Sequence, residues 1–165
     1  MGLDMYLLRC EKHDNGRKKS WNWDDFEEVA YWRKANHIHN WFVNNVQAGQ
    51  DDCGTYEVTK DQLEELVAVC NEVLESCKLE NGTVANGRYL DSSCNEFVTV
   101  LEDGQYIVDS SVAERLLPTT SGFFFGGTNY DEYYYNKTEE TARMIESILK
   151  YTNFETEVIF YTSSW

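Results

Sequence analysis

The sequence predicts a single α+β domain over residues 1–165, in which a small mixed or antiparallel sheet packs against three to four helices. Three observations support this fold class. Segments of strand character lie near the two ends of the chain, at 3–10 and 155–162. Between them, apolar residues recur at the three-to-four-residue spacing of amphipathic helices. With 165 residues, 42% of them hydrophobic, the chain is long enough to bury a core without disulfide or metal staples.

The first part of the chain predicts a strand, a loop and a long helix. The strand at 3–10 is apolar enough to be covered on both faces, which places Asp4 in or near the core. A carboxylate there needs a basic side chain, backbone amides or a metal as its partner. The polar segment 11–20 holds the only cluster of basic residues and predicts a loop or hairpin tip. One long amphipathic helix is then expected at 24–46, ended by Ala48-Gly49.

The clearest helix signal lies at 59–82, after a short extended piece at 55–58. Thr59 and Gln62 have the spacing of a capping box, and Asn81-Gly82 is a stop signal. The polar side of this helix carries a line of carboxylates about 21 Å long, at intervals of about 5–6 Å. That spacing is comparable with the phosphate spacing of a nucleic-acid strand, although a solvated helix face has the same pattern. The term acidic ridge denotes four of these residues: Asp61, Glu65, Glu72 and Glu75.

The elements of the second half are shorter. Strands or short helical pieces are expected at 97–101 and 106–108, followed by a short helix that starts at Ser110 or Ser111. At 119–129, glycines flank three phenylalanines and predict a strand that breaks sharply at both ends. Thr138 is the expected cap of a last helix, and the final strand follows it.

The charge of the protein is unevenly distributed. The formal net charge is −15, and all of it falls on residues 35–165, because basic and acidic residues balance in residues 1–34. Such a field repels nucleic acid and attracts cationic protein surfaces, while the alternative is a charge that only maintains solubility. The first residues lack the features of a signal peptide, and no run of 18 apolar residues occurs. These features predict a soluble protein of the cytoplasm that binds neither membrane nor nucleic acid directly.

Thiol and metal chemistry is the remaining source of candidate site residues. The five cysteines are odd in number and form no CxxC pair, which favours reduced thiols. His37, His39 and Cys53, with Asp4, Asp51 and Asp52 as oxygen donors, are of the residue types that bind zinc. Residues two apart on a helix point in different directions, so His39 with Cys53 is a better pair than the two histidines. The prediction is a structural zinc site; His37 can instead be a core histidine.

Nothing in the sequence predicts catalysis: GxSxG, HExxH and P-loop motifs are all absent. Several blocks instead carry a resemblance, namely GLDMYL at 2–7, YWRKAN at 31–36, IH at 38–39, WFV at 41–43, DDCG at 51–54, GFFFG at 122–126, YDE at 130–132 and SSW at 163–165. With these blocks the chain resembles a family of small proteins encoded by phages and prophages of Gram-positive bacteria. A small acidic protein in that setting is similar to anti-CRISPR proteins, including type II inhibitors that contain zinc. If the family binds a metal, the resemblance favours His39 and Cys53, which lie within its blocks.

The sequence therefore leads to one hypothesis and two alternatives. The hypothesis is a phage-encoded anti-CRISPR inhibitor that binds a type II effector nuclease through the acidic ridge and hinders DNA loading. The first alternative is a small-molecule or nucleotide-signal binding protein that uses the aromatic region 123–135 as its pocket. The second is a metal-dependent hydrolase, which needs an open coordination position on its zinc.

Overall fold

A four-stranded antiparallel sheet forms one layer of the molecule. The computed structural model describes residues 2–12 and 23–165, so most of the loop predicted at 11–20 lies outside the described residues. The strands stand in the order β2-β1-β6-β3, and their bounds are Asp4–Glu11 for β1, Glu27–Arg33 for β2, Thr55–Val58 for β3 and Glu157–Ser164 for β6. The strands predicted near the two ends of the chain are thus direct neighbours.

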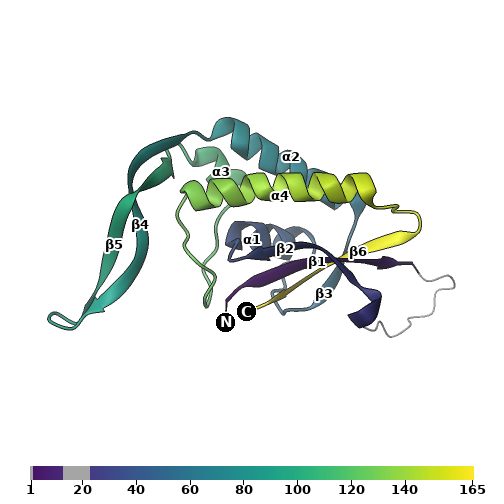
Figure 1. The fold of residues 1–165 in the computed structure, drawn as a ribbon, viewed down its shortest axis with the longest axis horizontal. Coiled ribbons are helices and arrows are strands. Elements are labelled where there is room, and N and C mark those ends of the chain that lie inside the picture. Colours follow the sequence, from purple (N-terminus) through teal and green to yellow (C-terminus); the bar gives the residue numbers. More distant parts are fainter. Residues whose placement is uncertain (1, 13–22) are drawn as a thin grey trace.

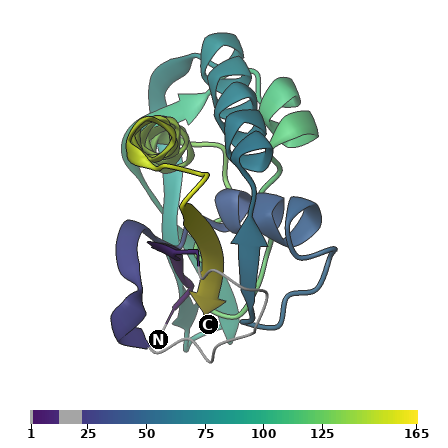
Figure 2. The same ribbon diagram turned by 90° about the vertical axis from the view of Figure 1, so that its right-hand side faces the viewer.

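The helices cover one face of this sheet. They are α1 (Asn36–Asn45), α2 (Lys60–Ser76), α3 (Ser111–Leu116) and α4 (Glu132–Tyr151). Figure 1 and Figure 2 show α2 and α4 side by side above the sheet, with α1 below them on the same side. The α+β class is confirmed, and the described residues contain four α-helices, within the three to four predicted from the sequence. No helix in the described part of the chain has both the length and the apolar character needed to cross a bilayer.

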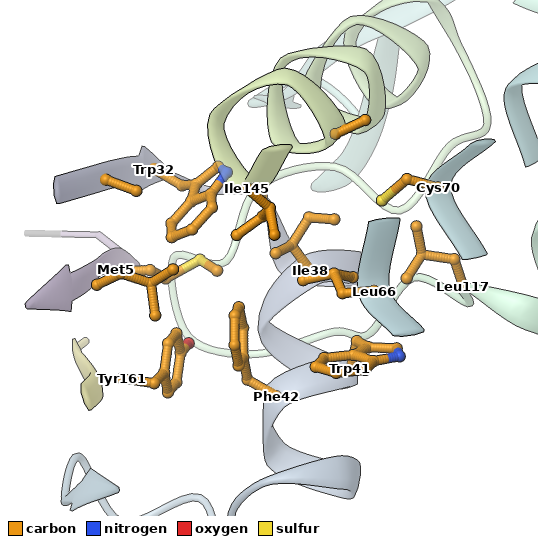
Figure 3. Close-up of a cluster of buried hydrophobic side chains, with 14 of the residues drawn as sticks. Met5, Trp32, Ile38, Trp41, Phe42, Leu66, Cys70, Leu117, Ile145 and Tyr161 are labelled. Atoms are coloured by element: carbon orange, nitrogen blue, oxygen red, sulfur yellow. The ribbon is translucent and has the colours of Figure 1, made fainter. Parts of the chain in front are cut away.

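Aromatic side chains dominate the core between the two layers. Phe42 of α1 stacks on Tyr161 of β6 with 4.1 Å between ring centroids. Trp32 of β2 is fully buried, and its indole N–H donates to Thr141 Oγ1 of α4 at 2.9 Å. Figure 3 shows these rings beside aliphatic side chains from α1, α2 and α4. Sheet and helices therefore share one continuous core.

The prediction of one long helix at 24–46 is wrong for the first half of that range. A short 3₁₀ turn, Trp23–Asp25, leads into strand β2, and α1 begins only at Asn36. Ala30 and Trp32 lie opposite Leu7 and Met5 of β1 and are buried, which is the two-residue period of a strand. The same apolar residues also fit a helical stripe, so the pattern alone did not separate the two structures. Lys34, with a φ of +56°, makes the break between strand and helix.

Of the two long helices, α2 begins where predicted but ends earlier, and α4 begins earlier than predicted. The capping box of α2 is confirmed, since Gln62 N–H donates to Thr59 Oγ1 at 3.2 Å and Thr59 N–H donates to Gln62 Oε1 at 2.9 Å. However, α2 ends at Ser76, and the predicted stop at Asn81-Gly82 lies inside a strand. Helix α4 is capped by Asp131 rather than Thr138, which is buried within the helix.

A second sheet consists of one long hairpin, here named the arm. Strand β4 (Leu79–Asp91) pairs antiparallel with β5 (Glu96–Ile107), so the pieces predicted at 97–101 and 106–108 belong to one strand. In Figure 1 the arm leaves the helical layer and extends beyond the body of the domain. Gly87, with a φ of +82°, lies in a bulge where β4 has one more residue than β5.

The glycine-flanked segment 119–129 does not form the predicted strand. Together with Tyr130 and Asp131, which lead into α4, it is here named the phenylalanine loop (119–131). Phe125 is buried, whereas Phe123 and Phe124 are exposed. Phe124 and Gly126 have φ values of +62° and +91°, which are incompatible with a continuous strand. Side-chain hydrogen bonds from α1 hold the loop in this irregular conformation.

Candidate functional site

Asn36, the first residue of α1, holds the phenylalanine loop in place. Its side-chain amide donates to the carbonyl oxygens of Phe125 at 3.2 Å and Gly127 at 2.8 Å, and its carbonyl oxygen accepts from Thr120 N–H at 3.1 Å. Asn36 is only 2% exposed, so the loop backbone replaces water as its partner. One side chain therefore fixes the loop at both ends of its phenylalanine run.

His39, one turn further along α1, lies at the centre of a buried hydrogen-bond chain. Its Nδ1 is 2.7 Å from the Tyr161 hydroxyl, and its Nε2 is 3.1 Å from Asp51 Oδ2. Burial raises the pKa of Tyr161 well above its ordinary value, so this hydroxyl keeps its proton. The Asp51 carboxylate is the acceptor for both of its neighbours: the Nε2–H of His39 donates to Oδ2, and the indole N–H of Trp165 donates to Oδ1 at 3.0 Å.

His37 faces a different environment from His39. Its ring lies 4.2 Å from the ring of Tyr134, and its Nε2 is 3.2 Å from Thr138 Oγ1. Burial lowers the pKa of His37 to about 3, so the imidazole is neutral at physiological pH. His37 is therefore the satisfied core histidine that the sequence allowed as an alternative.

Two cavities adjoin the phenylalanine loop. A cavity of about 370 Å³ lies beside His39 and is also lined by Asp51, Phe123, Phe125 and Trp165. A second cavity, of about 460 Å³, lies between the middle of the arm, the end of the loop and the start of α4. Lys34 and Asp131 bring opposite charges to this second cavity. Residues 123–135, predicted as a pocket region, thus contribute to both cavities.

The structure brings together only part of the predicted metal set. His39 and Asp51 are in contact, whereas Cys53 is exposed and Asp52 accepts from Gly54 N–H and Tyr56 instead. Asp4 is not buried in the core: at the start of the interior strand β1, it accepts from the Tyr31 hydroxyl of β2 at 2.5 Å.

These positions can be tested against the requirements of zinc. No group of three His, Cys, Asp or Glu residues in the described ranges, 2–12 and 23–165, is placed to hold a metal ion. Both ring nitrogens of His39 have protein partners, so the histidine has no free ligand atom in this arrangement. In this arrangement the described residues do not form a zinc site, and the structural zinc stays a prediction from the sequence.

The acidic ridge lies on the outer face of α2, and all four of its carboxylate side chains are exposed. Glu72 is 3.4 Å from Arg115, and both of these groups are solvent-exposed. Within the described part of the chain, no lysine or arginine lies within ion-pair distance of Asp61, Glu65 or Glu75. The ridge therefore presents mostly uncompensated negative charge.

Segments that are distant in the sequence meet at this site. The cavities are lined by residues from 31–36, 51–54, 122–126, 130–132 and 163–165, all of which are among the blocks that carry the resemblance. The roles of Tyr161 and Trp165 were not predicted, because only the sheet pairing and the fold of residues 46–54 bring them to His39. The searches of protein-family models, curated proteins and solved structures found no match to this chain.

Proposed function

We propose that this protein is a stoichiometric inhibitor that binds another protein, and that the arm is the element that enters the partner. The observation that carries the proposal is the set of large apolar side chains exposed on the arm. They are Tyr89, Leu90, Phe97, Val100, Leu101 and Tyr106. Exposed apolar side chains gathered on one element are typical of protein interaction surfaces.

These side chains occupy both faces of the arm. Leu90 and Phe97 are cross-strand partners and share one face, on which Leu101 also lies. Tyr89 pairs with Val98 on the opposite face, because successive residues of a strand alternate. A ribbon that is apolar on both faces fits a groove with two walls better than a flat surface. An isolated two-stranded hairpin is only marginally stable in water, so a partner that covers both faces also stabilises the arm.

Charge selects the kind of partner. Residues 79–107 contain five acidic residues and one basic residue, Arg88, whose guanidinium lies 4.9 Å from the centre of the Phe97 ring. The acidic ridge on α2 leads directly to the base of the arm, since β4 follows α2 in the chain. A second copy of this chain also has a net charge of −15, so repulsion opposes self-association. A cationic groove on another protein fits both the charge and the apolar side chains.

The resemblance to phage proteins and to anti-CRISPR proteins suggests the partner. Type II CRISPR effector nucleases hold nucleic acid in a positively charged channel, which is a cationic groove of the required kind. In this proposal the acidic ridge accelerates association, the arm occupies the channel, and target DNA no longer loads.

The test is cleavage of target DNA by a purified type II effector with its guide, with this protein added before or after the DNA. Inhibition is expected only when the protein is added first, and it should saturate near one equivalent and weaken with salt. Unchanged cleavage with several such nucleases would exclude this partner class.

Two sets of variants separate the contributions of arm and ridge. The double variant Phe97→Ser with Leu101→Ser should weaken inhibition about tenfold or more without changing the unfolding midpoint. The control Tyr151→Ser, which removes an exposed aromatic side chain of α4, should leave inhibition unchanged. Replacing the four ridge carboxylates by lysine should abolish inhibition. The matched control replaces four glutamates of α4 by lysine: Glu132, Glu139, Glu140 and Glu146. Equal loss with both quadruple variants would leave only a net-charge effect and refute a role for the ridge.

A further inference from the structure

We propose that the 370 Å³ cavity beside His39 binds a guanidinium or alkylammonium cation, with Asp51 as the counter-ion and Phe123 and Trp165 as aromatic walls. This inference rests on a different set of residues from the arm and does not depend on the inhibitor function.

Asp51 is positioned in advance for such a ligand. His39 Nε2 and the Trp165 indole N–H each contact one carboxylate oxygen, at 3.1 and 3.0 Å. His39 is itself fixed by Tyr161, so the orientation of the carboxylate is determined from within the core. A carboxylate has about four acceptor positions, and two donors leave about two of them for a ligand. The Asp51 side chain is 30% exposed and lines the cavity, so these positions are accessible.

The walls of the cavity are aromatic and partly exposed. Phe123 is 72% exposed and Trp165 is 48% exposed, although both are large apolar residues. Phe125 lies beneath them, with its ring 5.8 Å from the Trp165 ring and 5.3 Å from the His39 ring. A cation held against such rings gains cation–π attraction, and this gain increases when water is excluded. A ligand in this cavity also covers apolar surface that the fold itself leaves exposed.

The charges around the cavity favour a cation over other ligands. No lysine or arginine of the described residues lines it, so a phosphate or carboxylate has no positive partner there and meets Asp51 instead. A neutral apolar ligand would remove water from the carboxylate without replacing the lost hydrogen bonds. A guanidinium or ammonium group satisfies the carboxylate and the aromatic rings together. The cation can be a free amine or an arginine or lysine side chain on another protein.

The experiment is a ¹H–¹⁵N titration that follows the Trp165 indole signal, assigned by its loss in Trp165→Phe. The probes are capped arginine, N-acetylarginine methylamide, and its neutral isostere, N-acetylcitrulline methylamide. Capped arginine should give a saturable shift at roughly millimolar concentration, and citrulline should bind about tenfold more weakly or worse. No saturable shift with capped arginine, or equal binding of both probes, overturns the proposal.

Matched variants locate the binding. Asp51→Asn should weaken the arginine response about tenfold, whereas Asp52→Asn, with the same change of charge one residue away, should not. Phe123→Ala should weaken it several-fold, and Tyr151→Ala, which removes an exposed ring of α4 outside the cavity lining, should leave it unchanged. Equal losses within either pair contradict the assignment.

Two further probes identify the source of the cation. Free arginine and the peptide Gly-Gly-Arg-Gly-Gly carry the same guanidinium group on different backbones. Tighter binding of the free amino acid indicates a small-molecule ligand, and tighter binding of the peptide indicates a side chain of a protein partner.

Discussion

Replacing Asn36 by alanine should destabilise the protein and release the phenylalanine loop. The substitution removes three hydrogen bonds between one buried side chain and the loop backbone, to Phe125, Gly127 and Thr120. At about 1 kcal/mol for each bond, the full loss is about 3 kcal/mol. Water can reach the exposed Gly127 backbone and replace the hydrogen bond lost there, so the free energy of unfolding is expected to fall by about 2–3 kcal/mol. For a chain of this length, that corresponds to a fall in Tm of about 5–10 °C.

The assay is urea unfolding followed by tryptophan fluorescence, together with limited proteolysis of the native protein. Asn44→Ala is the matched control, because Asn44 is an exposed residue of the same helix whose side chain donates only to Asn40 Oδ1. The control should change the free energy of unfolding by less than about 0.5 kcal/mol. Asn36→Ala should also speed cleavage within 119–131. Equal stability of the two variants, or an unchanged cleavage rate, would refute the role assigned to Asn36.

Two further predictions concern buried polar groups. Because the pKa of His37 is lowered to about 3, the unfolded chain binds a proton below pH 6.5 that the folded protein does not bind, so stability decreases as the pH falls between these values. Between pH 7 and pH 5, the free energy of unfolding of His37→Gln should therefore fall by about 2 kcal/mol less than that of the wild type, as measured by urea unfolding. Parallel curves of the free energy of unfolding against pH for the two proteins would contradict this. Thr141→Val leaves the buried Trp32 indole N–H without its partner and should cost about 1–3 kcal/mol in the same assay. The exposed control Thr83→Val should be near neutral, and equal effects of the two threonine variants would show that this hydrogen bond contributes nothing.

Short-range signals in the sequence predicted the elements whose cause is local. The capping box at Thr59 and Gln62 formed as expected, because its two hydrogen bonds join residues only three apart. Cys70 of α2 and Cys77 at its C-cap are buried, as small apolar residues on the inner side of an amphipathic helix are expected to be. In both cases the residue type and its immediate neighbours decide the outcome.

The errors occurred where a distant partner decides the structure. Residues 27–33 have apolar residues that fit a helix or a strand, and they are extended because β1 offers an open edge with Leu7 opposite Ala30. The phenylalanine run fits a strand by composition, but the buried amide of Asn36 takes the carbonyls that a sheet would need. Competition between local propensity and a tertiary partner was settled by the partner.

The sequence by itself determined the α+β class, the acidic surface and the residue types available for a site. Only the tertiary structure joined His39, Asp51, Tyr161 and Trp165 into one hydrogen-bond chain and separated His37 from it. The physical reason is that composition and periodicity indicate which residues are apolar and which are polar, and both depend only on residues close together in the sequence. Hydrogen bonds between residues more than a hundred positions apart depend on sheet pairing and helix packing, which the whole chain sets at once.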